Sequence, residues 1–274
     1  MQKSLFIEGE VRLFGMLFLP EIEYRRPSGF VVIHPFAEEK KSAHRTLIEL
    51  SRRLYQNGYP VLMFDLRGCG DSEGSFVHVR LQEWLADIEK AVEVLKLYTG
   101  LSELGIIGLR FGAYLSMCYM EQHPGNISEC IWIEPVLNPV DYLRKSLRHK
   151  LMKELCTAGV ITSNRDVLLQ NLQQNKSIDF DGYEIGSGLF RDLVQAQETF
   201  DVLKQLRKGL IVSVSTTGKT TKTVQEICSL NAGVKQRTIK VELFWNKDDN
   251  VDSDELVFKI CEYVKENANE RRYF

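Results

Sequence analysis

The sequence is poor in the patterns that mark metal-binding, secreted and membrane proteins. Its six cysteines are scattered, and no two of them have CxxC spacing. We therefore expect reduced thiols, with neither a zinc site nor a redox dithiol. No run approaches the roughly 20 apolar residues that a membrane-spanning helix needs. The first residues lack the apolar stretch of a signal peptide, so the sequence predicts a cytoplasmic protein without a membrane span.

Charge gives little indication of a partner. The 274 residues carry a formal net charge of −2, which offers no electrostatic case for nucleic acid or an anionic membrane. Apolar residues make up 44% of the chain, enough for the core of one large α/β domain. The sequence shows no internal repeat, calls for no metal or cofactor, and does not predict the oligomeric state.

The most informative stretch is residues 105–113, Gly-Ile-Ile-Gly-Leu-Arg-Phe-Gly-Ala. A short apolar run ends in Gly-x-x-x-Gly and passes directly into a helical pattern, which is typical of a nucleophile elbow: a strand, a sharp turn and a helix. Serine is the usual residue at the centre of that turn, and here the residue is Arg110. A guanidinium stays protonated and has no lone pair to offer a carbonyl, so the frame of a hydrolase site is present without its nucleophile.

Apolar strands alternate with amphipathic helices along most of the chain, at a spacing of about 30 residues, which predicts a doubly wound, mostly parallel sheet. The alternation stops between residues 134 and 209, and this polar, helical segment predicts an inserted cap at about 139–208. We expect residues 1–274 to form a single domain with helices on both faces of the sheet, the first of them at 43–56. The eight expected strands are 5–8, 11–19, 29–33, 60–64, 105–108, 130–133, 210–215 and 240–245.

Three stretches together resemble the α/β-hydrolase superfamily over nearly the whole chain. His34-Pro-Phe follows a buried strand, as the oxyanion loop does in that superfamily. Asp65-x-Arg-Gly-x-Gly-x-Ser-x-Gly resembles the loop after the fourth strand, and Gly108-Leu-Arg-Phe-Gly lies where the elbow belongs. The resemblance implies the α/β-hydrolase fold, with the site at the elbow beneath the cap.

Within this superfamily the chain resembles the exosortase A system-associated hydrolases of type 2. The motifs that carry the resemblance are His34-Pro-Phe-Ala-Glu-Glu-Lys-Lys, Gly108-Leu-Arg-Phe-Gly-Ala, Ile131-Trp-Ile-Glu-Pro-Val with Leu143-Arg144 downstream, and Asp181-Gly-Tyr-Glu-Ile. That group is similar in having arginine in place of the elbow serine. The resemblance implies a bacterial protein linked to exopolysaccharide and protein-sorting gene neighbourhoods, with a hydrolase activity inferred from the fold.

The standard catalytic triad fails at all three of its positions. In this fold the order is nucleophile, acid and then histidine, with the histidine after the last strand. The five histidines end at His149, and the expected histidine position falls near Asn246 or Lys247. The loop after strand 210–215 reads Thr216-Thr-Gly-Lys and contains no carboxylate. The sequence therefore does not predict ordinary serine-esterase activity.

Two interpretations of Arg110 remain open. It lies at the start of a helix, where the dipole and the backbone N–H groups of Phe111 and of the loop from His34 to Phe36 favour an anion. In the second interpretation, a carboxylate of the chain, from Glu38, Glu39 or Asp65, pairs with Arg110 and fills the former site. We expect one of the two glutamates to be its partner.

Other residues near the elbow have both a chemical and a structural interpretation. His34 is a candidate general base or ligand donor, or a residue that fixes the turn before Pro35; Glu134 is a candidate acid at the end of a strand. Cys69 is a nucleophile candidate only if an imidazole lies beside it. Packing or loop contacts are the expected roles of the remaining candidates: Asp65, Arg67, Trp132, Tyr183 and Trp245.

Two functions from different classes fit these observations. The first is a hydrolase of an ester, acyl or glycan-linked anionic small molecule that works with non-standard residues, among which His34, Arg110 and Glu134 are the catalytic candidates. The second is a non-catalytic binding or scaffold protein that holds an anionic ligand or a partner in the former active-site pocket. In either case the expected ligand-binding residues are Arg110, Phe111, His34, Phe36, Glu38 and Glu39.

Overall fold

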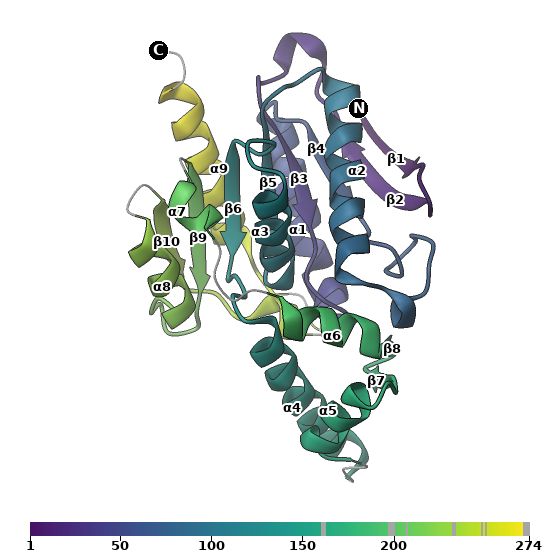
Figure 1. Ribbon diagram of the computed structural model, residues 1–274. Coiled ribbons are helices and arrows are strands. Elements are labelled where there is room, and N and C mark those ends of the chain that lie inside the picture. Colours follow the sequence, from purple (N-terminus) through teal and green to yellow (C-terminus); the bar gives the residue numbers. More distant parts are fainter. Residues whose placement is uncertain are drawn as a thin grey trace.

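The protein is described by a computed structural model that covers residues 1–159, 163–196, 201–206, 208–231, 234–247, 249 and 251–270. Its centre is an eight-stranded sheet with the order β1-β2-β4-β3-β5-β6-β9-β10 (Figure 1). The first two strands form an antiparallel hairpin at one edge, and the strands from β4 to β10 run parallel to one another. The strands are β1 (Gln2–Ile7), β2 (Leu13–Phe18), β3 (Gly29–Ile33), β4 (Val61–Phe64), β5 (Leu104–Leu109), β6 (Glu129–Ile133), β9 (Gly209–Val214) and β10 (Lys235–Ile239).

Helices cover both faces of the sheet because the central strands are apolar on both sides. In β3, Val31 and Ile33 face one hydrophobic core, whereas Phe30 and Val32 face the other. The helices α1 (Glu38–Gln56) and α9 (Asp254–Glu270) pack on the second of these cores. The first core is covered by α2 (Leu81–Thr99), α3 (Phe111–Gln122), α7 (Val202–Gln205) and α8 (Lys222–Leu230). None of the described helices is long and apolar enough to span a membrane.

The cap follows β6 and lies past the carboxyl ends of the parallel strands (Figure 1). Its first helix begins at Pro139, and the side chain of Asn138 accepts a hydrogen bond from the Asp141 N–H at 2.8 Å, which caps the helix end. The elements of the cap are α4 (Pro139–Ala158), α5 (Arg165–Gln173), the small hairpin β7 (Ile178–Phe180) and β8 (Tyr183–Ile185), and α6 (Ser187–Gln195). The next helix, α7, contacts α3 and α8 of the main body.

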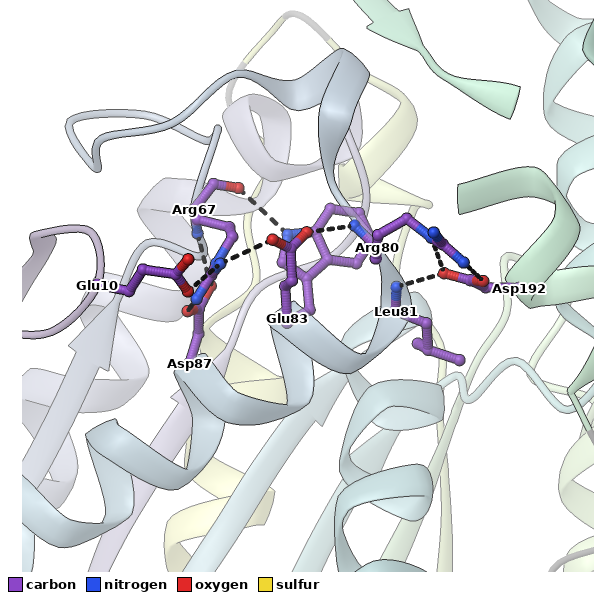
Figure 2. A network of polar contacts seen from close by, with 8 residues as sticks. Glu10, Arg67, Arg80, Leu81, Glu83, Asp87 and Asp192 are labelled. Carbon is purple, nitrogen blue, oxygen red and sulfur yellow. Dashed lines mark hydrogen bonds and ion pairs between the residues drawn. The ribbon is translucent and has the colours of Figure 1, made fainter. Parts of the chain in front are cut away.

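A polar network fixes one end of the cap to the main body (Figure 2). Asp192 of α6 accepts hydrogen bonds from Arg80 Nε at 2.8 Å, from Arg80 Nη2 and from the N–H of Leu81 at 3.0 Å. Glu83 joins this contact to the main body, because it accepts from the Arg80 N–H and from Arg67 Nη1. Asp87 holds the other edge of the Arg67 guanidinium, at 2.8 Å from Nη2. The cap is thus anchored at α6 through the start of α2.

The expected mostly parallel eight-stranded sheet is confirmed, but several element boundaries were wrong, among them that of β1, which was expected at 5–8 and spans Gln2–Ile7. The helix expected at 43–56 begins one turn earlier, at Glu38. The strand expected at 240–245 is not a strand: the last strand is β10, and Phe244–Asn246 is a 3-10 helix. The segment Lys-Gln-Arg-Thr-Ile of β10 is polar because it lies at the sheet edge, whereas the apolar Phe244 and Trp245 are buried under the sheet's carboxyl end.

Candidate functional site

The elbow has the expected geometry. Arg110 links β5 directly to α3 with φ 56° and ψ −114°, a conformation that non-glycine residues rarely adopt. A Cβ on Gly108 would lie 2.5 Å from Ala113 Cα, and a Cβ on Gly112 would lie 2.4 Å from the carbonyl oxygen of Ile33. Both glycines are therefore needed for the close approach of β5, α3 and β3. The turn directs the Arg110 side chain to the top of the sheet.

The guanidinium of Arg110 lies between one carboxylate and two aromatic rings. Its Nη2 donates to Glu39 Oε1 at 3.2 Å. Its Cζ is 5.0 Å from the ring centroid of Trp245 and 5.4 Å from that of Tyr142, within the range of cation–π contacts. The side chain keeps 21% of its surface exposed. The sequence-based expectation that Glu38 or Glu39 pairs with Arg110 is confirmed for Glu39.

The pair is incompletely hydrogen-bonded. Arg110 Nε and Glu39 Oε2 are both buried, and neither finds a hydrogen-bond partner among the described residues. Burial raises the pKa of the Glu39 carboxyl, and the neighbouring positive charge of Arg110 opposes this shift. One donor and one acceptor of the pair are thus unused, which is an unfavourable arrangement in a buried place.

This pair lies in the wall of a cavity of about 860 Å³ between the sheet and the cap. The cavity is large enough for a small organic molecule. Its α4 side carries three polar residues one turn apart, Lys145, His149 and Lys153. The opposite side is formed by the start of α1 and by the segment after β6. Further lining residues are Glu38, Ser42, Glu134, Val136, Leu137, Asp141, Tyr142, Ser146, Met152, Cys156, Phe180, Asp181, Glu226, Trp245 and Asn246.

The acid and the histidine of a triad were expected after β9 and after the last strand. Trp245 stacks on the guanidinium in the region where the histidine was expected, while Asn246 only lines the cavity. No carboxylate comes from the loop after β9, but Glu134 reaches that strand from the end of β6. Its Oε2 accepts from the N–H of Val214 at 2.9 Å, and burial raises its pKa. Glu134 also has a positive φ of 43°.

His34 is held as a structural residue of the loop before α1. It is 3% exposed, its Nδ1 lies 2.7 Å from the carbonyl oxygen of Pro35, and its Nε2 accepts from the N–H of Leu66 at 3.2 Å. This pattern assigns the proton to Nδ1. Burial, reinforced by Lys40, lowers the pKa of His34 to about 4. Both ring nitrogens are therefore occupied, and neither is directed to the cavity for proton transfer.

Among the other expected ligand-binding residues, Phe36 and Phe111 can offer a ligand only backbone groups, whereas Glu38 can offer its side chain. The rings of Phe36 and Phe111 are buried and 5.1 Å apart, in an aromatic cluster that also includes Tyr142 and Phe180. Only their backbone can serve a ligand; the N–H of Phe111 is at the first position of α3, where helices leave N–H groups without an intrahelical acceptor. Glu38 lines the cavity and pairs with Lys41 at 3.2 Å.

The glycine-rich loop after β4 has a structural role. Asp65 pairs with Lys40 at 2.9 Å, so it is not the partner of Arg110, and Arg67 belongs to the cap anchor described above. Cys69 is 2% exposed, and burial raises its pKa to about 12, which keeps the thiol protonated. No group of side chains in the described ranges is arranged to hold a metal ion.

The aromatic neighbours of Arg110 were not identified as site residues from the sequence. Trp245 was expected to be a packing residue of a final strand, and Tyr142 belongs to a helix whose cavity-facing side was unknown. One signal was present: Tyr142, Lys145, Ser146, His149 and Lys153 recur at the spacing of one helix face. The contact with Trp245 depends on how the segment after β10 turns back over the sheet. No local sequence pattern predicts this path.

The fold and the elbow define the class of this protein: it has the α/β-hydrolase fold. The family model described as serine aminopeptidase, S33, matches residues 29–198, and the chain belongs to this family. The matched segment runs from β3 through the elbow to the end of the described cap helices. The family description refers to a serine enzyme, whereas the elbow residue of this chain is Arg110.

Solved structures support the same fold. Est1E from Butyrivibrio proteoclasticus with bound ferulic acid has a TM-score of 0.72 at 19% identity, covering 98% of this chain and 100% of Est1E. DcsB in complex with its substrate analogue has a TM-score of 0.65 at 14% identity, covering 98% and 100%. XC6422 from Xanthomonas campestris, described as an α/β serine hydrolase without lid, has a TM-score of 0.60 at 16% identity, covering 97% and 94%. At such identities the likeness shows the fold and not the chemistry.

Proposed function

We propose that this protein uses the cavity above the elbow to bind a small molecule with a carboxylate or another anionic group, without serine-type catalysis. The observation that carries the proposal is the Arg110 guanidinium in the wall of the cavity, at the place where related enzymes have a serine. Its contact with Glu39 uses one hydrogen bond and leaves Nε without a partner among the described residues. An anion beside Arg110 gains a charge-assisted hydrogen bond and the free N–H groups of α3.

Backbone strain supports a binding role for this place. Ala37, Arg110 and Glu134, all with positive φ, follow the ends of the three neighbouring strands β3, β5 and β6. Strained non-glycine residues cost of order 1–3 kcal/mol each and cluster at functional sites. Arg110 and Glu134 both line the cavity, and their strain is better explained by a ligand than by a former site that has become only a packed core.

The composition of the cavity argues against acyl transfer. Ser42, Ser146, Thr223 and Cys156 are its hydroxyl and thiol candidates among the described residues, and His149 is its imidazole. His149 lines the same cavity as both serines, but no hydrogen bond between it and Ser42 or Ser146 is found among the described residues. A serine hydroxyl without a base is a weak nucleophile. Binding thus fits the described side chains better than a covalent mechanism.

Hydrolysis remains the second candidate, supported by a different observation. Glu39 and Glu134 both lie in the cavity wall, and burial raises the pKa of both carboxyls, which is a property of general acids and bases. In that case the substrate would be an ester, acyl or glycan-linked anionic small molecule, attacked by water. The structure of Est1E with bound ferulic acid makes this class of substrate reasonable to test.

Two finer assignments belong to the proposal as well. We propose the narrower relationship to the exosortase A system-associated hydrolases of type 2, with its exopolysaccharide context, on the motifs quoted above. We also propose a cytoplasmic location, which agrees with six cysteines that are all free.

The test separates binding from serine catalysis. We expect no stoichiometric adduct with a fluorophosphonate probe and no appreciable turnover of short p-nitrophenyl esters, because no described serine of the cavity has a base. Intact-mass spectrometry measures the adduct, and absorbance measures the turnover. A serine labelled at one equivalent would overturn the binding proposal, whereas ester turnover that is lost in Glu39→Gln or Glu134→Gln would favour the water-attack mechanism.

A further inference from the structure

The guanidinium of Arg110 already lies beside two carboxylates of the chain. Glu39 Oε1 is 3.2 Å from its Nη2, and Glu134 lines the same cavity, close enough for its charge to act on Arg110. Glu134 is held in place there, because its Oε2 accepts a hydrogen bond from the N–H of Val214 at 2.9 Å. A ligand carboxylate at Arg110 is therefore a third negative group beside one positive charge, and carboxylates that share a site oppose one another's ionisation.

Arg110 is the main group that keeps Glu39 ionised. The strongest influences on Glu39 from other elements are those of Arg110 at the elbow and of Tyr142 and His149 in α4. The Glu39 side chain is only 14% exposed, and burial raises its pKa, while Arg110 opposes the rise more than any other group does. Its Oε2 is buried and has no hydrogen-bond partner in the described part of the chain. Glu39 therefore depends on one guanidinium for its negative charge.

Lysines near Glu39 do not replace Arg110 in this role. On α1, Lys40 pairs with Asp65 at 2.9 Å and Lys41 pairs with Glu38 at 3.2 Å. Three of the five remaining charged residues in the described cavity wall are carboxylates, so the wall brings no surplus of cations to a bound anion. These five residues are Asp141, Lys145, Lys153, Asp181 and Glu226. An anion at Arg110 needs another source of positive charge, and a proton is the one that solvent supplies.

We infer that an acid ligand binds in the Arg110 cavity together with one proton, which Glu39 takes up from solvent as the ligand carboxylate replaces it at Arg110. The inference rests on the proposed function. The proton bonds to a carboxylate oxygen of Glu39, so the cavity keeps its net charge when a monoanion enters. A neutral Glu39 can stay buried beside the ligand, and its hydroxyl becomes a hydrogen-bond donor. The ligand class is a monoanionic carboxylic acid, bound more tightly as the pH falls.

The experiment uses cinnamate as the probe, titrated calorimetrically into the whole protein. Cinnamate lacks the ring substituents of the ferulic acid bound by Est1E, so its carboxyl is its only titrating group and is ionised at about pH 7 and above. Titrations at about pH 8 in HEPES and in Tris, which differ in ionisation enthalpy, give the number of protons taken up per ligand. We expect about one proton, and a Kd that rises about tenfold from about pH 7 to about pH 8.

The variant Glu39→Gln assigns the proton, because glutamine keeps the shape of glutamate and takes up no proton. We expect this variant to show no proton uptake and a Kd that changes by less than about twofold from about pH 7 to about pH 8. At about pH 8 it should bind cinnamate about tenfold more tightly than the wild type, or better, because no negative charge competes for Arg110. The control Glu49→Gln alters a carboxylate of the same helix that pairs with Arg53 outside the cavity, and it should match the wild type within about twofold.

Each contrary result has a distinct meaning. Binding of cinnamate without proton uptake in the wild type, or uptake that persists in Glu39→Gln, would overturn the inference and leave the binding proposal standing. Weaker binding by Glu39→Gln at about pH 8 would also overturn it, since Glu39 would then only support the site. Uptake that is lost in Glu134→Gln alone would place the proton on Glu134 instead. No cinnamate binding to the wild type at millimolar concentration would contradict both the inference and the proposed function.

Discussion

At the scale of single residues, a side chain at the centre of the elbow points to the top of the sheet whatever its chemistry. Arg110 is much longer than serine, so its guanidinium extends from the turn to Glu39 of α1, Tyr142 of α4 and Trp245 near the end of the sheet. Three elements distant in sequence thus meet at one positive charge. The guanidinium organises the wall of the cavity as well as offering a donor to a ligand.

The ion pair predicts a stability change that depends on which charge is removed. Arg110→Ala leaves Glu39 buried without its cation, so we expect the free energy of unfolding to fall by about 3 kcal/mol. Arg110→Met/Glu39→Leu removes both charges and should remain within about 1 kcal/mol of the wild type. Urea melts in mildly alkaline buffer, where Glu39 is ionised, measure both. Unchanged stability of Arg110→Ala would mean that the guanidinium points into solvent.

His34 should remain neutral in weakly acidic solution. Its pKa is about 4 in the folded protein, against an ordinary value of 6.5, because the buried ring is poorly solvated. The folded value is the lower one, so the stabilisation from His34 is complete above pH 6.5 and is lost as the pH falls through about 4. NMR titration of labelled histidines measures this directly. A pKa near 6.5 for His34 would show that the ring is solvated and free to act as a base.

The sequence located the elbow and favoured two glutamates as partners of Arg110, but it did not choose between Glu38 and Glu39. The choice depends on where α1 begins. Because the helix starts at Glu38, successive residues point about 100° apart, so Glu38 turns to Lys41 and Glu39 to Arg110. Ala37, at φ 47°, allows this early start, and no local sequence pattern predicted its unusual backbone.

At the scale of elements, buried strands were predictable and the edge strand was not. The central strands read as continuous apolar runs because both of their faces are covered. β10 has one neighbour only, and its polar side chains gave no strand pattern, whereas the apolar run after it suggested a strand. That error also moved Trp245 away from the site in the sequence-based interpretation.

The cap is anchored at α6, which predicts unequal mobility of its two ends. Asp192→Ala removes the three hydrogen bonds to Arg80 and Leu81, so amide exchange in α6 should become roughly tenfold faster. Global stability should fall by no more than about 1 kcal/mol, because Arg80 is half exposed. Hydrogen exchange with mass spectrometry compares this variant with Asp166→Ala, which breaks a local pair on α5. Equal exchange of α6 in both variants would show that the anchor lies elsewhere.

At the scale of the whole molecule, the chain has the α/β-hydrolase fold, and Arg110 stands at the centre of its elbow. The sheet order, the elbow glycines and the cap place a cavity of about 860 Å³ beside Arg110. The alternation of apolar strands and amphipathic helices along the chain predicted this fold well, because a sheet that is buried on both faces requires apolar strands. The side chains that line the cavity come from α1, α4 and the segment after β10. Local sequence patterns do not determine how these elements are placed relative to one another.

The most direct test of the account is ligand-observed NMR with a panel of small carboxylic acids, ferulic acid among them. The wild type and the uncharged variant Arg110→Met/Glu39→Leu are compared, with Arg52→Ala as the control for loss of an exposed arginine. We expect acids that bind the wild type to bind the control as well and not to bind the uncharged variant. A wild type that binds no acid of the panel, or an uncharged variant that binds the same acids equally well, would contradict it.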